Sequence, residues 1–273
     1  MKKYIKIFIV FLVVGGMSCS QAIDVLVEAT PIPLDYCNIE CIEVTDFEIY
    51  RPNRKVKLDA FLICDHEVTQ GEWQWVMGNL DDLIPDDEHG KSENYPMYSV
   101  SWLDAVEFCN ALSEKHGFEK CYIIDGEDVS CDFTKPGYRL PTAAEWEYAS
   151  CAGIDGDLPY SGAVSEDDEN IDDYVWFDEN SGKTIHKVGT KKANAFGLRD
   201  MSGNVWEWCW DWWDESKTYN GTDNPKGPET GTDKALRGGG YECPLDKVNA
   251  RSYGVFPPDH QWRLLGFRVC KNK

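Results

Sequence analysis

The stretch Gly203-Asn204-Val205-Trp206-Glu207-Trp208-Cys209-Trp210-Asp211-Trp212-Trp213 carries the strongest structural signal in the chain. Tryptophan occupies every second position from residue 206 to 212, so these side chains share one face of an extended strand. Such a face is either an exposed platform for a ligand or a part of the core whose indole N–H groups find acceptors. Burial is the more frequent arrangement. The stretch therefore predicts a β-strand whose tryptophans lie mainly in the core.

Two helices are predicted on the N-terminal side of this strand. One begins at about Ser101, with Asp104 as the partner in a box-like cap, and the other begins at Thr142, where Glu145 completes a capping box. The first helix carries an apolar stripe at helical spacing, made of Ala105, Phe108, Cys109 and Leu112. Alternating apolar residues over positions 56–63 predict strands. Two helices among many Gly, Asn and Asp turns indicate an α+β domain with long irregular loops.

Composition and charge exclude several classes of function. The chain has 273 residues, 42% of them hydrophobic, and a formal net charge of −21. We expect no nucleic-acid partner, because phosphate neutralisation needs a basic face. No Ser/His/Asp arrangement or phosphate-binding loop is visible. The Gly238-Gly239-Gly240 run lacks a following lysine and helix start, so we interpret it as a site of tight backbone packing.

The N-terminus has the pattern of an export signal. Lys2, Lys3 and Lys6 precede the apolar run 7–14, and small residues lead to Cys19. We therefore predict a lipoprotein signal peptide over residues 1–18, with Cys19 lipidated, which places the protein on the outer membrane or cell surface through its lipid anchor. Ordinary secretion with Cys19 discarded is the alternative. Residues 19–53 are predicted to be a tether with an initial strand, and residues 54–273 to be the folded domain.

The chain contains eleven cysteines and five histidines. The cysteines that remain after Cys19 are even in number, which permits disulfides in an exported chain but does not select a pairing. Only Cys37 and Cys41 lie close together, without the partners of a zinc site. The histidines are scattered with no ligand spacing, so no catalytic role is predicted for them.

Seven motifs occur in order along the chain: Glu67-Val68-Thr69, Val100-Ser101-Trp102-Leu103-Asp104-Ala105, Tyr138-Arg139-Leu140-Pro141-Thr142-Ala143-Ala144-Glu145-Trp146-Glu147-Tyr148-Ala149, Asn194-Ala195-Phe196-Gly197-Leu198, Gly203-Asn204-Val205-Trp206-Glu207-Trp208, Leu236-Arg237-Gly238-Gly239 and Gly266-Phe267-Arg268-Val269. Over about residues 56–270 this series resembles the formylglycine-generating enzyme, or sulfatase-modifying factor, family. The resemblance implies a C-type-lectin-like fold of that subtype, with a twisted antiparallel sheet, two helices and terminal strands that lie near each other.

The enzymes of this family oxidise a sulfatase cysteine with two active-site cysteines that bind copper. Resemblance places Cys243 at the first of these positions, while the second, five residues further on, is Val248. A single thiol cannot form a two-sulfur copper site, so we expect no catalysis and no catalytic cofactor. A copper oxidase acting on a sulfatase cysteine remains the alternative function.

Four further blocks occur in order near the C-terminus: Arg237-Gly238-Gly239-Gly240-Tyr241, Ala250-Arg251-Ser252, Pro258-Asp259 and Leu265-Gly266-Phe267-Arg268-Val269. With these blocks, residues 237–269 also resemble the variable proteins of diversity-generating retroelements, most of all the treponemal variable surface lipoproteins. This implies a monomeric, surface-displayed, receptor-like or adhesin-like protein whose diversified segment binds an external ligand, expected to be a protein. A structural envelope protein or accessory factor with a fixed partner is a further alternative. The implied ligand-binding residues are Tyr241, Glu242, Cys243, Pro244, Gly254, Val255, Phe256, Pro257, His260, Trp262, Arg263 and Leu264.

Relatives in the family carry structural calcium, and the resemblance implies a matching site here. Its ligands are Asp200, the main-chain carbonyls of Gly203 and Val205, and Glu207, and such hard oxygen donors suit Ca²⁺. The alternative is that Glu207 bonds backbone or arginine groups in the core.

Overall fold

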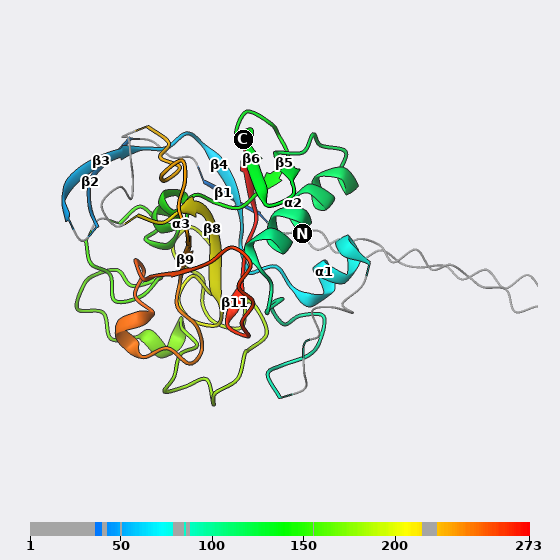
Figure 1. The fold of residues 1–273 in the computed structure, drawn as a ribbon. Helices are drawn as coiled ribbons and strands as arrows, with labels where there is room; N and C mark the ends of the chain where they lie inside the picture. The colour runs from blue at the N-terminus through cyan, green and yellow to red at the C-terminus, as the bar shows by residue number, and fades with distance from the viewer. Residues whose placement is uncertain are drawn as a thin grey trace, which may run out of the picture. The chain divides into compact units, whose positions relative to one another are not determined.

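The computed structural model describes residues 36–39, 43–49, 51–78, 85, 88–154, 156–214 and 223–273. All of them belong to one compact unit, residues 32–273 (Figure 1). The predicted signal peptide and Cys19 lie outside the described residues, as does most of the predicted tether. In the described part, no helix combines the length and apolar character that crossing a membrane requires.

One sheet joins the two ends of the unit. Its strand order is β1 (Tyr36–Ile39), β4 (Phe61–Cys64), β12 (Cys270–Asn272), β7 (Tyr138–Arg139), and every neighbouring pair is antiparallel. Figure 1 shows the red C-terminal strand beside β4, which confirms the proximity of the terminal strands. The predicted domain start at residue 54 falls inside β3 (Arg51–Lys57). β1, which pairs with β4, lies within residues 19–53, the segment for which a tether with an initial strand was predicted.

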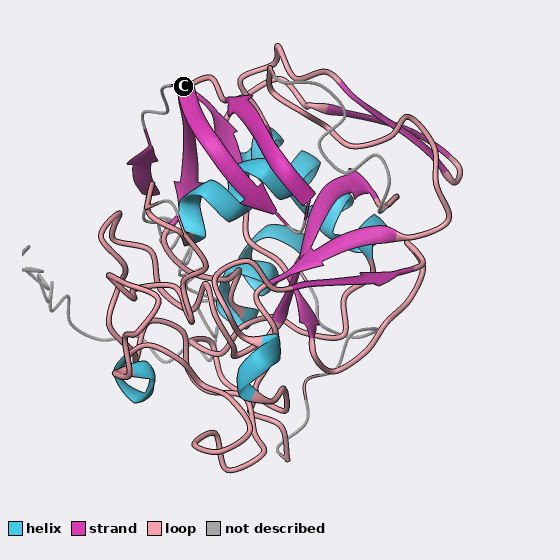
Figure 2. Cartoon of the chain, turned by 90° about the vertical axis from the view of Figure 1, so that its left-hand side faces the viewer, coloured by secondary structure: helices cyan, strands magenta, loops and turns pink. Residues whose placement is uncertain are grey.

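A second sheet contains the tryptophan strand. Its order is β10 (Tyr253–Phe256), β9 (Lys234–Arg237), β8 (Trp206–Trp212), β11 (Leu265–Gly266), and β11 alone runs parallel to its neighbour. Two antiparallel hairpins complete the strands: β2 (Glu43–Ile49) with β3, and β5 (Tyr122–Asp125) with β6 (Asp128–Cys131). Figure 2 shows the long loops that connect these elements.

Three α-helices occur in the described residues, each with a capping box. The boxes of α2 (Trp102–Lys115) and α3 (Ala143–Ser150) confirm the two predicted helices. The third helix, α1 (Gln70–Met77), was not predicted, although Thr69 and Glu72 form the same box there. Two short 3-10 turns, η1 (Ile171–Asp173) and η2 (Leu245–Lys247), lie in the loops.

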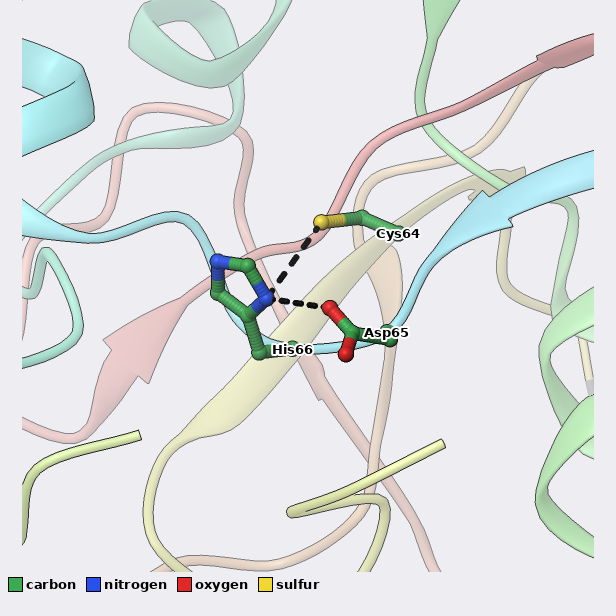
Figure 3. Close-up of side chains that lie close together, drawn as sticks. All are labelled: Cys64, Asp65 and His66. Carbon is green, nitrogen blue, oxygen red and sulfur yellow. Dashed lines mark hydrogen bonds and ion pairs between the residues drawn. The ribbon is translucent and has the colours of Figure 1, made fainter. Parts of the chain in front are cut away.

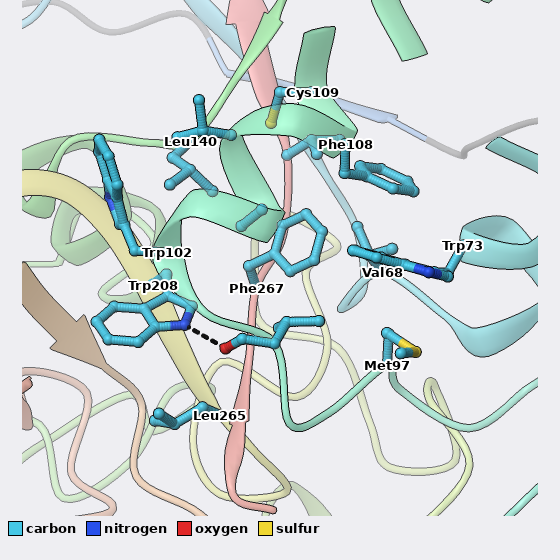
Figure 4. Close-up of a cluster of buried hydrophobic side chains, with 14 of the residues drawn as sticks. Val68, Trp73, Met97, Trp102, Phe108, Cys109, Leu140, Trp208, Leu265 and Phe267 are labelled. Atoms are coloured by element: carbon cyan, nitrogen blue, oxygen red, sulfur yellow. Dashed lines mark hydrogen bonds between the residues drawn. The ribbon is translucent and has the colours of Figure 1, made fainter. Parts of the chain in front are cut away.

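The main core forms where α1 and α2 pack with the strands. Trp208 is fully buried, and its indole N–H donates to the Val100 carbonyl at 2.9 Å (Figure 4). Along the same strand, Trp206 is also buried, whereas Trp210 and Trp212 are half-buried. The prediction of a mainly buried tryptophan strand is therefore confirmed. The architecture is the α+β, C-type-lectin-like fold.

Candidate functional site

The predicted ligand-binding segment divides into buried and accessible positions. Tyr241 and Leu264 are 0% and 1% exposed, so in this structure they support the surface above them and do not form it. The other ten predicted residues are at least partly accessible to solvent, and two of them, Pro244 and Pro257, are exposed. Val255 lies on the strand face opposite to Gly254 and Phe256, because side chains alternate along β10.

Six of the predicted side chains form what we call the C-terminal surface: Glu242, Cys243, Phe256, His260, Trp262 and Arg263. Phe256 stacks on His260 with ring centroids 4.2 Å apart and meets Trp262 edge-on at 5.8 Å. The main-chain N–H of His260 donates to the Pro257 carbonyl at 3.0 Å and closes a turn. This turn places the imidazole of His260 against the phenyl ring of Phe256. Arg263 donates to both carboxylate oxygens of Glu242 at 2.9 Å.

Trp206 forms the floor beneath this surface. A Cβ atom on Gly240 or on Gly254 would lie 3.4 Å from the Trp206 ring, so both glycines let the backbone lie against the indole. The main-chain N–H of Trp206 donates to the Leu264 carbonyl at 2.7 Å. The loop after β9 and the strand β10 therefore lie against the Trp206 indole, and the segment before β11 is held by the Trp206 backbone.

Cys243 is the thiol of this surface. Burial raises the pKa of its thiol, while hydrogen bonds from the Gly240 N–H and from Trp206 act in the opposite direction. Val248, at the position of the enzymes' second cysteine, is fully buried in an apolar cluster. The residues therefore do not fit a two-thiolate copper site.

Below the surface lies a set of buried residues that we call the frame: Arg237, Tyr241, Leu264 and Arg268. Arg237 bonds Glu147 at 2.8 Å and the Arg251 carbonyl at 2.9 Å. Arg268 holds both oxygens of Glu207, at 2.6 and 2.7 Å. These pairs join motifs that are far apart in sequence, which explains in physical terms why the charged motif residues occur together.

Backbone packing under the surface depends on Gly239. Its φ is +79°, and a Cβ atom there would lie 2.3 Å from the Lys247 carbonyl oxygen. Only glycine satisfies both conditions without a shift of the turn. The interpretation of the glycine run as tight packing is therefore confirmed.

The two side chains among the implied calcium ligands, Asp200 and Glu207, are buried and already hydrogen-bonded within the protein. Glu207 is occupied by Arg268 and also accepts the Trp146 indole N–H at 2.7 Å. Asp200 accepts the Gly189 N–H at 2.7 Å, and its pKa is raised, first of all by burial. Glu207 thus bonds an arginine in the core, which is the alternative stated for it, and the charge of that one guanidinium also acts on the buried carboxyls of Asp200 and Glu67.

One accessible neighbour was missed. Gln261 is exposed between His260 and Trp262, and its side-chain amide donates to Asp104 at the start of α2 at 3.0 Å. The two residues are 157 positions apart, so no local sequence signal pointed to this contact.

The eight cysteines whose side chains are described are all free thiols. They are Cys64, Cys109, Cys121, Cys131, Cys151, Cys209, Cys243 and Cys270. Only Cys131 and Cys243 among them are not fully buried.

Comparison with known proteins gives a match to one family and matches to individual relatives. The family described as the sulfatase-modifying factor enzyme 1-like domain matches residues 24–273. The chaperone protein LppX of Paenibacillus barcinonensis is 30% identical in an alignment of 307 positions that covers 100% of both chains. The formylglycine-generating enzyme of Mus musculus is 32% identical in an alignment of 200 positions that covers 68% of this chain and 46% of that one.

Solved structures agree with the fold. Treponema denticola variable protein 1 is 31% identical with a TM-score of 0.75, and the match covers 87% of this chain and 95% of that one. CarF, 22% identical with a TM-score of 0.67 over 88% of this chain and 99% of its own, shows the fold alone. The predicted resemblance is confirmed, and it begins nearer the N-terminus than residue 56.

Proposed function

The chain belongs to the sulfatase-modifying factor family, and we propose that within this family it is a non-catalytic, surface-displayed protein that binds an external ligand through the C-terminal surface. Cys19 anchors it by lipid to the outer membrane or cell surface. A retroelement diversifies the codons of that surface, and the bound ligand is a protein. The similarity to Treponema denticola variable protein 1, at 31% identity over most of both chains, supports this proposal.

The arrangement of the C-terminal surface over its frame is the observation that carries the proposal. Six partly accessible side chains from three separate segments lie there, while the residues that hold those segments are buried. Phe256 contacts His260 and Trp262, and Glu242 is bonded to Arg263. A surface that accepts many side chains cannot also supply the core, because a core loses stability with almost every change of volume. Separation of the two roles is what a diversified binding surface requires.

The chemistry of the C-terminal surface favours a protein ligand. Phe256, Trp262 and Arg263 are of the residue types that dominate protein interfaces, where each contributes on the order of 1–4 kcal/mol when centrally buried. Glu242 and Arg263 add a polar edge, with side chains 27% and 41% exposed. Such a mixture matches the apolar centre and polar rim of a protein interface.

Two features argue against the copper oxidase. Val248 stands in the place of the second thiol, and Cys243 has its sulfur partly buried against Gly240. Copper binding by the intact protein together with oxidation of a peptide cysteine, both abolished by Cys243→Ser, would overturn the non-catalytic proposal.

The direct test is a comparison of the DNA for residues 237–269 with any near-identical repeat beside a reverse-transcriptase gene. We expect differences only at adenines, in codons of the C-terminal surface and of the adjoining Pro244, Gly254 and Pro257. Codons for Tyr241 and Leu264 are expected to stay constant, since both side chains are buried. Absence of a repeat, or a uniform segment in deep sequencing of a population, would contradict diversification.

An accessory factor with one fixed partner is the second candidate, favoured by the full-length similarity to the chaperone protein LppX. It predicts a uniform C-terminal segment, so the same sequencing separates the two proposals. The lipid anchor is tested independently by labelling cells with a fatty acid. Label that disappears with Cys19→Ala is expected, and label that survives this change would overturn the anchor.

A further inference from the structure

Outside the C-terminal surface, three consecutive residues place metal-binding atoms together where β4 leads toward α1. Cys64 Sγ lies 3.9 Å from His66 Nδ1, and Asp65 Oδ1 lies 2.5 Å from the same nitrogen. The three ligand atoms lie within 4.8 Å of one another. Figure 3 shows the imidazole pointing toward both the sulfur and the carboxylate.

The backbone explains how adjacent residues face one another. Side chains of residues 64 and 66 would share a side in an extended strand, with residue 65 opposite. Here β4 ends at Cys64, whose N–H donates to the Val269 carbonyl at 2.9 Å, and a bend follows at Asp65 and His66. The bend turns the Asp65 carboxylate to the histidine side. Arg199 fixes it there, with its main-chain N–H 2.8 Å from the Asp65 carbonyl and its guanidinium 3.0 Å from Oδ2.

We propose that Cys64, Asp65 and His66 form a binding site for a divalent transition metal, with Zn²⁺ as the expected ion. Thiolate, imidazole and carboxylate are the donors that zinc takes in proteins. Tetrahedral zinc with ordinary bond lengths separates N and S by roughly 3.5 Å and N and O by roughly 3.3 Å. Small side-chain rotations, sulfur inward and carboxylate outward, reach these values from the distances in the structure.

A second layer of contacts orients the histidine for this role. His66 Nε2 lies 3.2 Å from Glu72 Oε1, and Glu72 is only 2% exposed. The other oxygen of Glu72 accepts the Thr69 N–H at 2.7 Å in the capping box of α1, so the carboxylate is held from both sides. A carboxylate that accepts a hydrogen bond from one imidazole N–H keeps the proton on that nitrogen and leaves the other nitrogen as the metal donor, an arrangement found around metal-ligating histidines.

The cluster is open to solvent on one side. Cys64 is fully buried, but the side chains of Asp65 and His66 are 16% and 17% exposed. An ion can therefore enter from the exposed side, and the fourth position is available to water. Without metal, the same histidine is an imidazolium held between Asp65 and Glu72, which is the purely structural alternative that the experiment decides.

The test is metal binding by the purified chain after treatment with a chelator. Titration with Zn²⁺ should give one equivalent bound per chain, and Co²⁺ should give a thiolate-to-cobalt charge-transfer band with the visible spectrum of a tetrahedral site. Cys64→Ser and His66→Gln should each abolish the charge-transfer band or the binding. Cys243→Ser is the matched control, because it removes a partly exposed thiol of another region and should leave both signals intact.

The Glu72→Gln variant tests whether Glu72 orients His66 for metal binding, separately from its role in the folding of α1. Glutamine also serves in a capping box, so α1 is expected to form, whereas metal affinity should fall by about 10- to 100-fold. Circular dichroism of each variant checks that the chain is folded. Failure of the intact chain to bind Zn²⁺ or Co²⁺ would overturn the site, as would a cobalt–thiolate band that survives Cys64→Ser, because the metal would then lie on another thiol.

Discussion

The C-terminal surface and the frame each contain an arginine that pairs with a glutamate. In the C-terminal surface a single nitrogen of Arg263 bonds both carboxylate oxygens, whereas two nitrogens of Arg268, in the frame, each bond one oxygen. Arg263 holds both oxygens of Glu242 at 2.9 Å, and Arg268 holds both oxygens of Glu207 at 2.6 and 2.7 Å. The first pair is 41% and 27% exposed, whereas the second is 0% exposed on both sides. The same two residue types therefore differ in their effect on stability, because burial determines the free energy lost when one partner is replaced.

The largest effect should come from breaking the buried pair. Arg268→Met leaves Glu207 as an uncompensated buried carboxylate, and we expect the free energy of unfolding to fall by about 3–5 kcal/mol. Arg263→Met, the matched change at the surface, should cost about 1 kcal/mol or less. Urea unfolding of both variants measures the difference. Equal losses would remove the distinction between surface and frame.

Gly239 tests the turn that carries the surface. Gly239→Ala meets both a positive φ of +79° and the Lys247 carbonyl, so we expect a loss of about 2–3 kcal/mol. Gly126→Ala is the control, because Gly126 has a φ of +63° but no atom within 4 Å of the added Cβ. It should lose only about 1 kcal/mol. Similar melting temperatures for the two variants would contradict this prediction, because they would show that the turn at Gly239 accommodates the added Cβ atom by a small shift.

Lys234 carries a buried amino group, and its register partner across β9 and β10 is Phe256. Its ammonium lies 3.8 Å from the Trp102 ring centroid and 3.7 Å from that of Trp212. Burial lowers the pKa of Lys234 to about 7, although Asp211 acts in the opposite direction. Above pH 7 the unfolded chain therefore holds a proton that the folded chain has lost, up to the ordinary lysine pKa of 10.5.

Lys234 should consequently contribute a rise of the free energy of unfolding with pH in this window. His66, whose raised pKa acts with the opposite sign, opposes this rise, so the contribution is measured against the Lys234→Met variant. We expect a gain of about 1–3 kcal/mol between pH 7 and 9, from about 1.4 kcal/mol per pKa unit. Lys234→Met should abolish this contribution, and urea unfolding of both proteins at the two pH values measures it. An equal change with pH in the variant would show that another group is responsible.

The smallest expected effect concerns calcium. Because Arg268 already occupies Glu207, adding Ca²⁺ should leave the melting temperature where an equal concentration of Mg²⁺ leaves it. A stabilisation specific to Ca²⁺ and lost with Asp200→Asn would contradict this expectation. It would show that the ion displaces the arginine and binds at Asp200 and Glu207.

Local signals in the sequence predicted the parts of the fold that local physics determines. Capping boxes located α2 and α3, and the alternation of tryptophans located β8. The same logic, applied to Thr69 and Glu72, would have located α1. Predicting the frame was harder, since Arg237 and Arg268 meet partners 90 and 61 positions away.

The candidate site was predicted only as a set of positions. Nothing in the sequence distinguished Tyr241 and Leu264, which are buried, from Phe256 and Trp262, which are accessible. The cluster at Cys64, Asp65 and His66 was missed altogether, because in a regular strand the middle residue faces away from the other two. The bend after β4 reverses that expectation, and only the structure reveals it.

The most direct test of the account is a saturation scan of residues 237–269, with the proteolytic stability of every single substitution measured in the folded protein. We predict severe losses for most substitutions in the frame, at Arg237, Tyr241, Leu264 and Arg268. Most substitutions of the C-terminal surface, at Glu242, Cys243, Phe256, His260, Trp262 and Arg263, should stay within about 1.5 kcal/mol of the parent. Surface positions as intolerant as the frame would contradict a display surface built on a separate support.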